Sequence, residues 1–568
     1  MHPLFLVDEL LLQIFRYLRP GSRKSLAFLA RTCNAFHGPA IEVLWGQLCN
    51  ATPIIRLLPQ DALSSGKVQE GFYTRIWVGL RIGIVSIAST SFIHSLLQTL
   101  TRPLMASDLV AVEKYAPLVR HLGAEEQGSL PPSTHTYRRD TVSPYAMSHL
   151  AECYPHPCLF PGIRRLDWRV VMRAFSPTGV VGQHSWEDML VYVGPELREL
   201  CINDGAWTPP TDYTLAALAE LLDTVGKQCI ALESLTLPRL SPHDSLIIYE
   251  SLSSLVCRLS GLHTLRCVFA SLSGPALAHL ISSSVIQELQ LGLPDRWKPW
   301  ARPVDGQPLL FSSLTTIEIA VASALSYISF ARSVSLPQVK SATLCLTPYP
   351  SATQLDDLFS AIGQQFSPDR LVQLRITSLV PDPSVDVTLR PIVLSSHLRS
   401  LLPFRRMQQI TIDADWECGY DDDDVLGEMA EAWPGLQRML LVARGDLHAR
   451  SYARSHSPSR ATLRSLIPFA TCCKDLKFLG IWLHADIRAD HEAIEAAIAQ
   501  ASPNRPSPPL EILKVMDSTI EGPPERIAHF LSTLFPSLPI ILANGADEHV
   551  ERWREVEKLL PAARVRHR

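Results

Sequence analysis

Residues that could do chemistry occur in this chain only as incomplete groups. Cys153, His156 and Cys158 are donors of the kind that hold zinc, but zinc takes four ligands and no second cysteine pair stands at finger spacing. Residues 491–492 are a histidine and a glutamate, without the second histidine that a zinc protease needs one helical turn later. We therefore predict a protein that is not an enzyme and that holds no metal or cofactor.

Two charged segments each have a chemical and a structural interpretation. Asp421 to Asp424 offer cation ligands, but residues 419–420 and 425 break the alternating spacing of an EF-hand, so a solvated helix N-terminus is favoured. Arginines and serines alternate between 444 and 464, which indicates a mobile loop, with a contact for an acidic partner as the alternative. The net charge of -4 gives no reason to expect binding to nucleic acid or membrane.

Length and composition indicate a large folded protein. The 568 residues exceed what one hydrophobic core usually supports, so several domains or a solenoid are expected. Apolar residues make up 46% and charged residues 19%, which excludes wholesale disorder. The 12 cysteines follow an N-terminus without a signal-peptide core, which predicts reduced thiols in an intracellular protein, cytoplasmic or nuclear. Residues 82–101 contain too many polar side chains to predict a membrane span.

A repeated sequence pattern predicts the strands and helices that position these side chains. In each copy an apolar residue is followed at +3 and +5 by two more, which is the alternation of a strand packed on one face. Fourteen copies, 24 to 44 residues apart, begin at Val119, Ile163, Leu197, Leu232, Leu262, Ile286, Leu314, Val339, Leu371, Met407, Leu436, Leu476, Leu510 and Leu538. Helical stripes such as 215–225, 246–256 and 355–362 lie between them.

A unit made of a strand, a helix and a connection back to the next strand, repeated about every 25 to 35 residues, is typical of a leucine-rich-repeat solenoid. The predicted fold is therefore α/β, an irregular solenoid with parallel strands on the concave face and helices outside. An ordinary α/β domain is the alternative, because most copies lack the asparagine of regular repeats. Surface loops are expected at 125–161, 302–308 and 444–458, and a last helix at 547–560 is expected to cap the array before a basic tail.

Strand positions +2, +4 and +6 of each copy point away from the core and line the concave surface. In the middle copies these positions hold small or polar residues. In the last copies they hold the apolar residues Leu440, Val442, Phe478, Trp482, Ile512 and Met516. Such a cluster predicts a protein-binding site, with burial under the terminal helix or tail as the alternative.

The first 48 residues predict three short amphipathic helices. Their apolar stripes are Val7, Leu10, Leu11, Ile14, Phe15 and Leu18; Leu26, Leu29, Ala30 and Cys33; and Ile41, Leu44, Trp45 and Leu48. Pro20 and Gly21 end the first helix, and Pro39 suits the first turn of the third. Three helices this short are expected not to enclose a core of their own, which indicates docking onto another protein.

This segment resembles an F-box. The likeness rests on the run Leu6 to Pro20, followed by Leu26 to Cys33, Phe36 and Trp45. The variant Ala30 to Phe36 with Pro39 to Trp45 is similar to the F-box-like proteins expanded in mushroom-forming fungi. The resemblance implies a substrate receptor of an SCF-type cullin-RING ubiquitin ligase, in which the F-box binds the Skp-type adaptor and the repeats bind an unknown protein target. The adaptor contacts that it implies are Leu6, Val7, Leu10, Ile14, Leu18, Leu26, Leu29 and Trp45.

One position departs from the F-box pattern, because Val7 stands where the family usually has a proline that starts the helix and touches the adaptor. The alternative function is accordingly a repeat scaffold outside any ligase, with a degenerate F-box that serves as the N-terminal cap. Either function predicts the same organisation: an F-box-like domain at 1–50, a helical linker at 51–113, the solenoid at 114–543, and the cap helix and tail at 544–568.

Overall fold

The computed structural model forms two compact units, Met1–Leu280 and Ile281–Arg568, which are described separately. It describes residues 7–18, 23–70, 93–123, 140–142, 144–156, 158–168, 187–202, 212–238, 240, 244–294, 308–346, 350–378, 391–414, 416–419, 423–443, 461–486, 492, 495–496, 507–516, 518–543 and 547–565. The predicted loops at 302–307 and 444–458 lie outside these ranges, as do Leu6, Pro20 and Gly21.

The three predicted N-terminal helices are confirmed as α1 (Asp8–Leu18), α2 (Arg23–Leu29) and α3 (Asn34–Trp45). The expectation that they enclose no core of their own is wrong, because side chains from all three helices pack together into a small core: Leu11, Phe15, Leu26, Ala30, Ala40 and Val43. The prediction that Pro39 opens the third helix is wrong, because α3 begins earlier and contains this proline in its interior.

The residues after α3 form a mixed segment that differs from the helical linker expected at 51–113. It contains α4 (Thr52–Ile55), the antiparallel strands β2 (Leu63–Glu70) and β3 (Ile93–Leu100), and α5 (Val110–Tyr115). Further along, α6 (Pro144–Cys153) lies where a loop was expected at 125–161. The loop prediction is wrong there because a proline at the first helical position favours a helix start.

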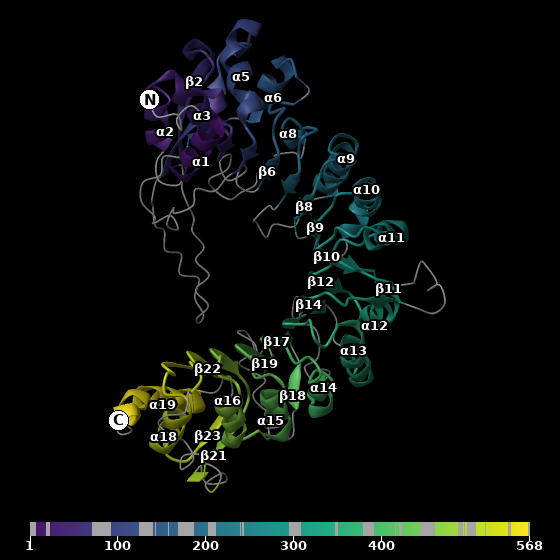
Figure 1. Cartoon of the computed structure of the whole chain (residues 1–568), viewed down its shortest axis with the longest axis vertical. Coiled ribbons are helices and arrows are strands. Elements are labelled where there is room, and N and C mark those ends of the chain that lie inside the picture. Colours follow the sequence, from purple (N-terminus) through teal and green to yellow (C-terminus); the bar gives the residue numbers. More distant parts are fainter. Residues whose placement is uncertain are drawn as a thin grey trace. The chain divides into compact units, whose positions relative to one another are not determined.

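The remaining elements of the first unit alternate between strands and helices. Its parallel strands are β1 (Gln47–Leu48), β4 (His121–Leu122), β6 (Arg165–Asp167), β7 (Glu199–Cys201), β8 (Ser234–Thr236) and β9 (Thr264–Arg266). Three helices lie between these strands: α8 (Glu187–Leu190), α9 (Asp212–Gln228) and α10 (Ser245–Arg258). Helix α11 (Gly274–Ser282) follows the last strand, β9. Figure 1 shows α9 and α10 along one side of β8 and β9.

The second unit continues the same alternation. Its parallel strands are β10 (Glu288–Leu293), β12 (Thr316–Val321), β14 (Ser341–Leu346), β15 (Gln373–Ser378), β17 (Gln409–Ala414), β19 (Arg438–Ala443), β20 (Phe478–Gly480), β22 (Ile512–Met516) and β24 (Ile540–Ala543). Its helices are α12 (Ala324–Ser333), α13 (Ala352–Gln365), α14 (Ser395–Arg399), α15 (Asp423–Ala432), α16 (Leu466–Cys472), α18 (Pro524–Leu534) and α19 (Asp547–Val565). The helices α12 to α16 lie on one side of these strands (Figure 1).

The strand order confirms the predicted solenoid. Within the described residues, the fifteen strands of the main sheet follow one another in sequence order, and neighbouring strands such as β1 and β4, β10 and β12, and β22 and β24 are parallel. An ordinary doubly wound domain is excluded, because its strand order would reverse at a switch point. Each of the fourteen predicted copies contains a strand that begins two residues after its first apolar residue, as His121 follows Val119 and Ile540 follows Leu538.

The repeat pattern also explains where the core lies. In the copy that begins at Leu314, this residue, Ile317 and Ile319 are all buried, whereas the residues between them are partly exposed. Helix α13 buries its apolar stripe on the same core, and a capping box of Ser351 and Gln354 starts it. Within the described residues, the helices are all too short or too polar to span a membrane.

Candidate protein-interaction surfaces

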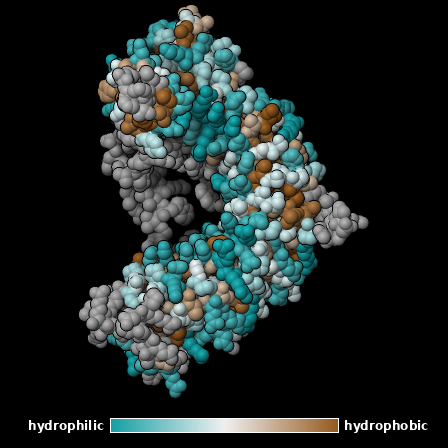
Figure 2. Space-filling view, in the orientation of Figure 1, coloured by the Kyte–Doolittle hydropathy of each residue, from teal (hydrophilic) through white to brown (hydrophobic). Residues whose placement is uncertain are grey.

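Helix α1 has a second apolar face beside the one that it buries. Leu11 and Phe15 point into the three-helix core, with the Phe15 ring packed edge-on against Phe36 at 5.7 Å between centroids. Val7, Ile14 and Leu18 are 40%, 47% and 41% exposed, and Leu10 is half-buried. At 100° per residue these four side chains form one stripe along the helix, the N-terminal apolar stripe. Figure 2 shows hydrophobic side chains gathered around the N-terminal helices.

The other implied adaptor contacts have structural roles in the three-helix domain. Leu26 is fully buried in the core, so it stabilises the helices and cannot touch a partner in this conformation. Leu29 is half-buried against the same core. Trp45 is half-buried and stacks on the Tyr115 ring, with centroids 4.7 Å apart. Of the eight implied contacts, the structure therefore brings four onto one outward stripe, and it does not describe Leu6.

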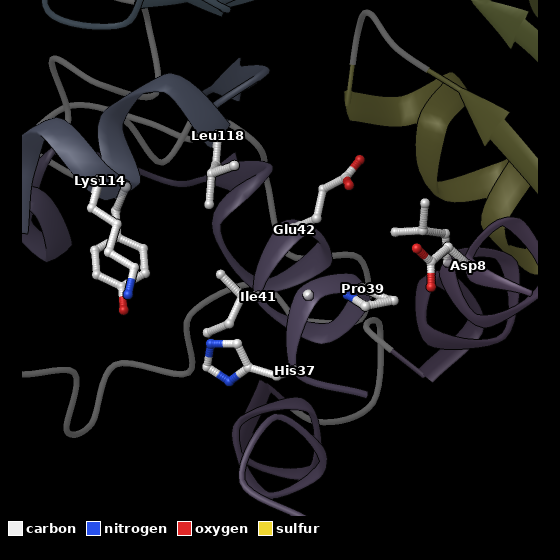
Figure 3. Close-up of a pocket in the computed structure, with 10 residues that line it drawn as sticks. Asp8, His37, Pro39, Ile41, Glu42, Lys114 and Leu118 are labelled. Atoms are coloured by element: carbon white, nitrogen blue, oxygen red, sulfur yellow. The ribbon is translucent and has the colours of Figure 1, made fainter. Parts of the chain in front are cut away.

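A cavity of about 430 Å³ lies between the three-helix domain and the segment that follows it (Figure 3). It is lined by residues of α1, of α3 and of the segment after it: Asp8, Leu12, His37, Gly38, Pro39, Ile41, Glu42, Lys114, Tyr115 and Leu118. The His37 ring nitrogen Nδ1 lies 2.9 Å from the Ala30 carbonyl oxygen, which holds the imidazole in place. The cavity mixes both charge signs with apolar walls, so its lining does not indicate a particular ligand.

The concave surface of the second unit is polar over its middle strands. Because neighbouring strands are in register, equivalent side chains stand in rows across the sheet. The two rows on the concave side contain Thr316, Glu318, Ser341, Thr343, Gln373, Arg375, Gln409 and Thr411. Few of these side chains offer apolar contact area, so the middle of this surface lacks the hydrophobic centre of a typical protein interface.

The exposure predicted for the apolar concave cluster is wrong for three of its residues. Leu440, Trp482 and Met516 are buried. Leu440 stands opposite Gly480 in the ladder. Because glycine has no side chain, the Leu440 side chain occupies the space where a Cβ of residue 480 would lie. Met516 adopts a positive φ of 50° beside a register shift in β22, so the alternation of a regular strand no longer holds there. The side chain of Val442 lies outside the described part of the chain.

The remaining apolar residues form a different patch at the end of the sheet. Phe478 and Ile512 are partly exposed and stand next to each other in the ladder. Ile540, the next member of this row, is 40% exposed, and Leu542 on the same strand is 42% exposed. We call Phe478, Ile512, Ile540 and Leu542 the C-terminal concave patch. Ile540 and Leu542 are positions +2 and +4 of the last copy, which begins at Leu538. The same rule that selected Phe478 and Ile512 would therefore have selected them if it had been applied to this copy.

The terminal helix does not cover this patch. Helix α19 packs on α18, on β24 itself and on the small strand β23 (Thr519–Glu521), and Trp553 is buried with its indole N–H donating to the Ser518 carbonyl oxygen at 3.0 Å. Ile540 and Leu542 stay exposed beside it. The predicted alternative of burial under the terminal helix is therefore not supported for Ile540 and Leu542, and the end of the tail, residues 566–568, lies outside the described residues.

The described members of the candidate metal-binding groups take up ordinary structural positions, and Asp421, Asp422 and His491 lie outside the described residues. Cys153 and His156 are exposed whereas Cys158 is buried. Asp423 and Asp424 form the first turn of α15, as the interpretation of a helix N-terminus predicts. The described cysteines are free, and burial raises the pKa of Cys473 to about 12, which keeps this thiol protonated and unreactive at neutral pH.

Comparisons with known proteins find only weak likenesses. No protein-family model and no curated protein matches the sequence. An internalin from Listeria monocytogenes is similar at 12% identity and a TM-score of 0.30, covering 69% of this chain and 91% of its own. The complex of Rad7 and Elc1 in yeast is similar at 13% identity and 0.33, covering 64% and 82%. The leucine-rich repeat-containing protein LegL7 from Legionella pneumophila is similar at 10% identity and 0.27, covering 63% and 97%. At TM-scores this low the likeness says nothing about function.

Proposed function

We propose that this chain is a non-enzymatic substrate receptor of an SCF-type cullin-RING ubiquitin ligase inside the cell. Its N-terminal helices would bind the Skp-type adaptor, and its repeats would bind a protein target. The observation that carries the proposal is the N-terminal apolar stripe, which stands on an F-box-like three-helix domain in front of a solenoid. Ubiquitin transfer would follow from holding a target lysine near a charged conjugating enzyme, because tethering raises its effective concentration.

The exposed part of the stripe would supply a part of the binding free energy, and the other contacts with the adaptor would have to supply the rest. A fully buried aliphatic side chain contributes about 1.5–3 kcal/mol, so covering the exposed fractions of Val7, Ile14 and Leu18 contributes about 1 kcal/mol each before ordering costs. The domain is already folded around its own core, so little ordering is needed when it binds.

Co-purification with the Skp-type adaptor tests this proposal. We expect Ile14→Asp combined with Leu18→Asp to weaken adaptor binding by about tenfold or more, since two apolar contacts are replaced by desolvated charges. Leu246→Asp is the matched control, because Leu246 is also a helical leucine and is 68% exposed on α10 of the same unit. If the wild-type chain retains no adaptor, or the double variant retains as much, the ligase proposal fails.

A second candidate function is a repeat scaffold in which the three helices only cap the solenoid. Two contacts favour it: β1 follows α3 directly and pairs with β4 as the first strand of the sheet, and Trp45 stacks on Tyr115. A cap needs no outward apolar stripe, so this function predicts that Ile14→Asp changes neither binding nor stability. Trp45→Ala would then lower the melting temperature without any effect on a partner.

A further inference from the structure

A histidine and two carboxylates meet on a short ladder in the second unit. Strand β21 (His484–Asp486) is parallel to β23, with His484 opposite Thr519 and Asp486 opposite Glu521. The residues between them, Ala485 and Ile520, are fully buried. Alternation along a strand therefore puts the other four side chains together on the outer side of the ladder.

We propose that His484, Asp486 and Glu521 bind one divalent transition-metal ion of the zinc class. Their donor atoms all lie within 4.8 Å of one another. Imidazole nitrogen and carboxylate oxygens are ligands of this ion at about 2.0–2.2 Å, with water completing a tetrahedral site. The His484 Nε2 and Glu521 Oε1 atoms are 4.0 Å apart, so a small side-chain rotation brings both onto one ion.

The surroundings orient the imidazole as a metal site requires. Nδ1 of His484 lies 2.5 Å from the Thr519 hydroxyl oxygen. When Nδ1 carries the proton and donates to this oxygen, Nε2 presents its lone pair toward the carboxylates. A hydrogen bond to the second ring nitrogen is the usual way in which proteins set the tautomer of a metal-binding histidine.

Backbone contacts hold the ladder in place from both sides. The His484 amide donates to the Ala461 carbonyl oxygen at 2.7 Å, and the Leu483 amide donates to the Ser518 hydroxyl at 2.9 Å. Arg552 of α19 donates to the Ile520 carbonyl oxygen at 2.8 Å. Because the strands are already fixed, a bound ion would join the repeat of β20 to the repeat of β22 at little ordering cost.

Zinc titration of the full chain, followed by calorimetry, tests the proposal. The chain has 12 cysteines that also take zinc, so the comparison is between variants. We expect the wild type to bind one more equivalent of zinc than His484→Ala or Asp486→Asn, and to gain melting temperature on zinc addition where these variants do not. His149→Ala is the control, because His149 is also paired with a glutamate, at 3.1 Å from Glu152, on another element.

Cobalt substitution separates this site from thiolate binding. We expect the extra equivalent of cobalt in the wild type to lack the charge-transfer band of a thiolate ligand. The proposal is overturned if the wild type and both site variants bind the same number of zinc equivalents. It is also overturned if the extra cobalt equivalent of the wild type shows the charge-transfer band of a thiolate ligand. Each variant must keep the metal-free melting temperature and circular dichroism of the wild type. If Asp486→Asn unfolds the chain, Glu521→Gln replaces it.

Discussion

Arg102 joins two aspartates in the segment before α5. Its Nε atom donates to Asp61 Oδ2 at 2.8 Å, and its two terminal nitrogens donate to both oxygens of Asp108 at 2.7 and 3.1 Å. The Met105 amide donates to Asp108 as well, at 2.9 Å. The hydrogen bond from Arg102, followed by the one from Met105, lowers the pKa of the Asp108 carboxyl, and Arg102 also lowers the pKa of Asp61.

These shifts predict how stability depends on pH. A carboxyl whose pKa is lower in the folded state stabilises the fold above its ordinary pKa of about 3.9, and this stabilisation is lost as the pH falls through the lowered value. We expect Asp108→Asn to lower the melting temperature at pH 7, and this difference from the wild type to shrink at pH values below about 4. Scanning calorimetry over this range measures it. Glu113→Gln on the exposed side of α5 is the control, and an undiminished difference in acid contradicts the assignment.

At the scale of elements, one glycine decides how β19 and β20 pack. A Cβ on Gly480 would lie 2.4 Å from Cδ1 of Leu440, closer than atoms can approach, so Leu440 would have to move out. We expect Gly480→Ala to destabilise the second unit by about 1–3 kcal/mol. Gly435→Ala is the control, because its added Cβ meets nothing within 4 Å.

Urea unfolding of the single and double variants measures this coupling. If Leu440 and Gly480 compete for one space, adding Leu440→Ala to Gly480→Ala costs less than the sum of the two separate changes. Additive costs would show that the two side chains do not share this space. The added Cβ would also lie 3.3 Å from Cε1 of Phe478, whose ring centroid is 3.9 Å from the Arg438 guanidinium carbon.

At the scale of the whole molecule, the proposed function assigns separate surfaces to adaptor and target. The N-terminal apolar stripe lies in the first unit, and the C-terminal concave patch lies in the second. We expect Ile540→Asp combined with Leu542→Asp to leave adaptor binding unchanged and to reduce the set of proteins captured by proximity labelling in cells, because charges placed in an apolar patch must be desolvated when a target binds.

The reciprocal variant completes this experiment. Ile14→Asp with Leu18→Asp is expected to leave target capture intact while it weakens adaptor binding. Leu325→Asp, at a leucine of α12 that is 53% exposed, is the control for the second unit. Unchanged capture by the Ile540 and Leu542 variant would show that the target binds elsewhere on the solenoid.

The solenoid itself could be predicted from local pattern because twelve of the fourteen copies, from Ile163 to Leu510, bury the same three positions of the repeat. That requirement needs no knowledge of the partner strand, and it located the strands of fourteen copies. Strand β1 was not predicted because Trp45 and Leu48 keep the first two apolar positions whereas Asn50 stands at the third. The three N-terminal helices were predictable for the same local reason.

Only the tertiary structure decided which apolar side chains remain accessible and which polar groups meet. Leu26 and Ile14 both belong to amphipathic helical stripes, yet packing buries the first completely and leaves the second 47% exposed. Leu440 is hidden because a glycine from another repeat stands beside it. His484 and Glu521 are far apart in the chain and become neighbours only through strand register. Periodicity sets the face on which a side chain lies, but exposure and clustering depend on what the neighbouring repeat places next to it.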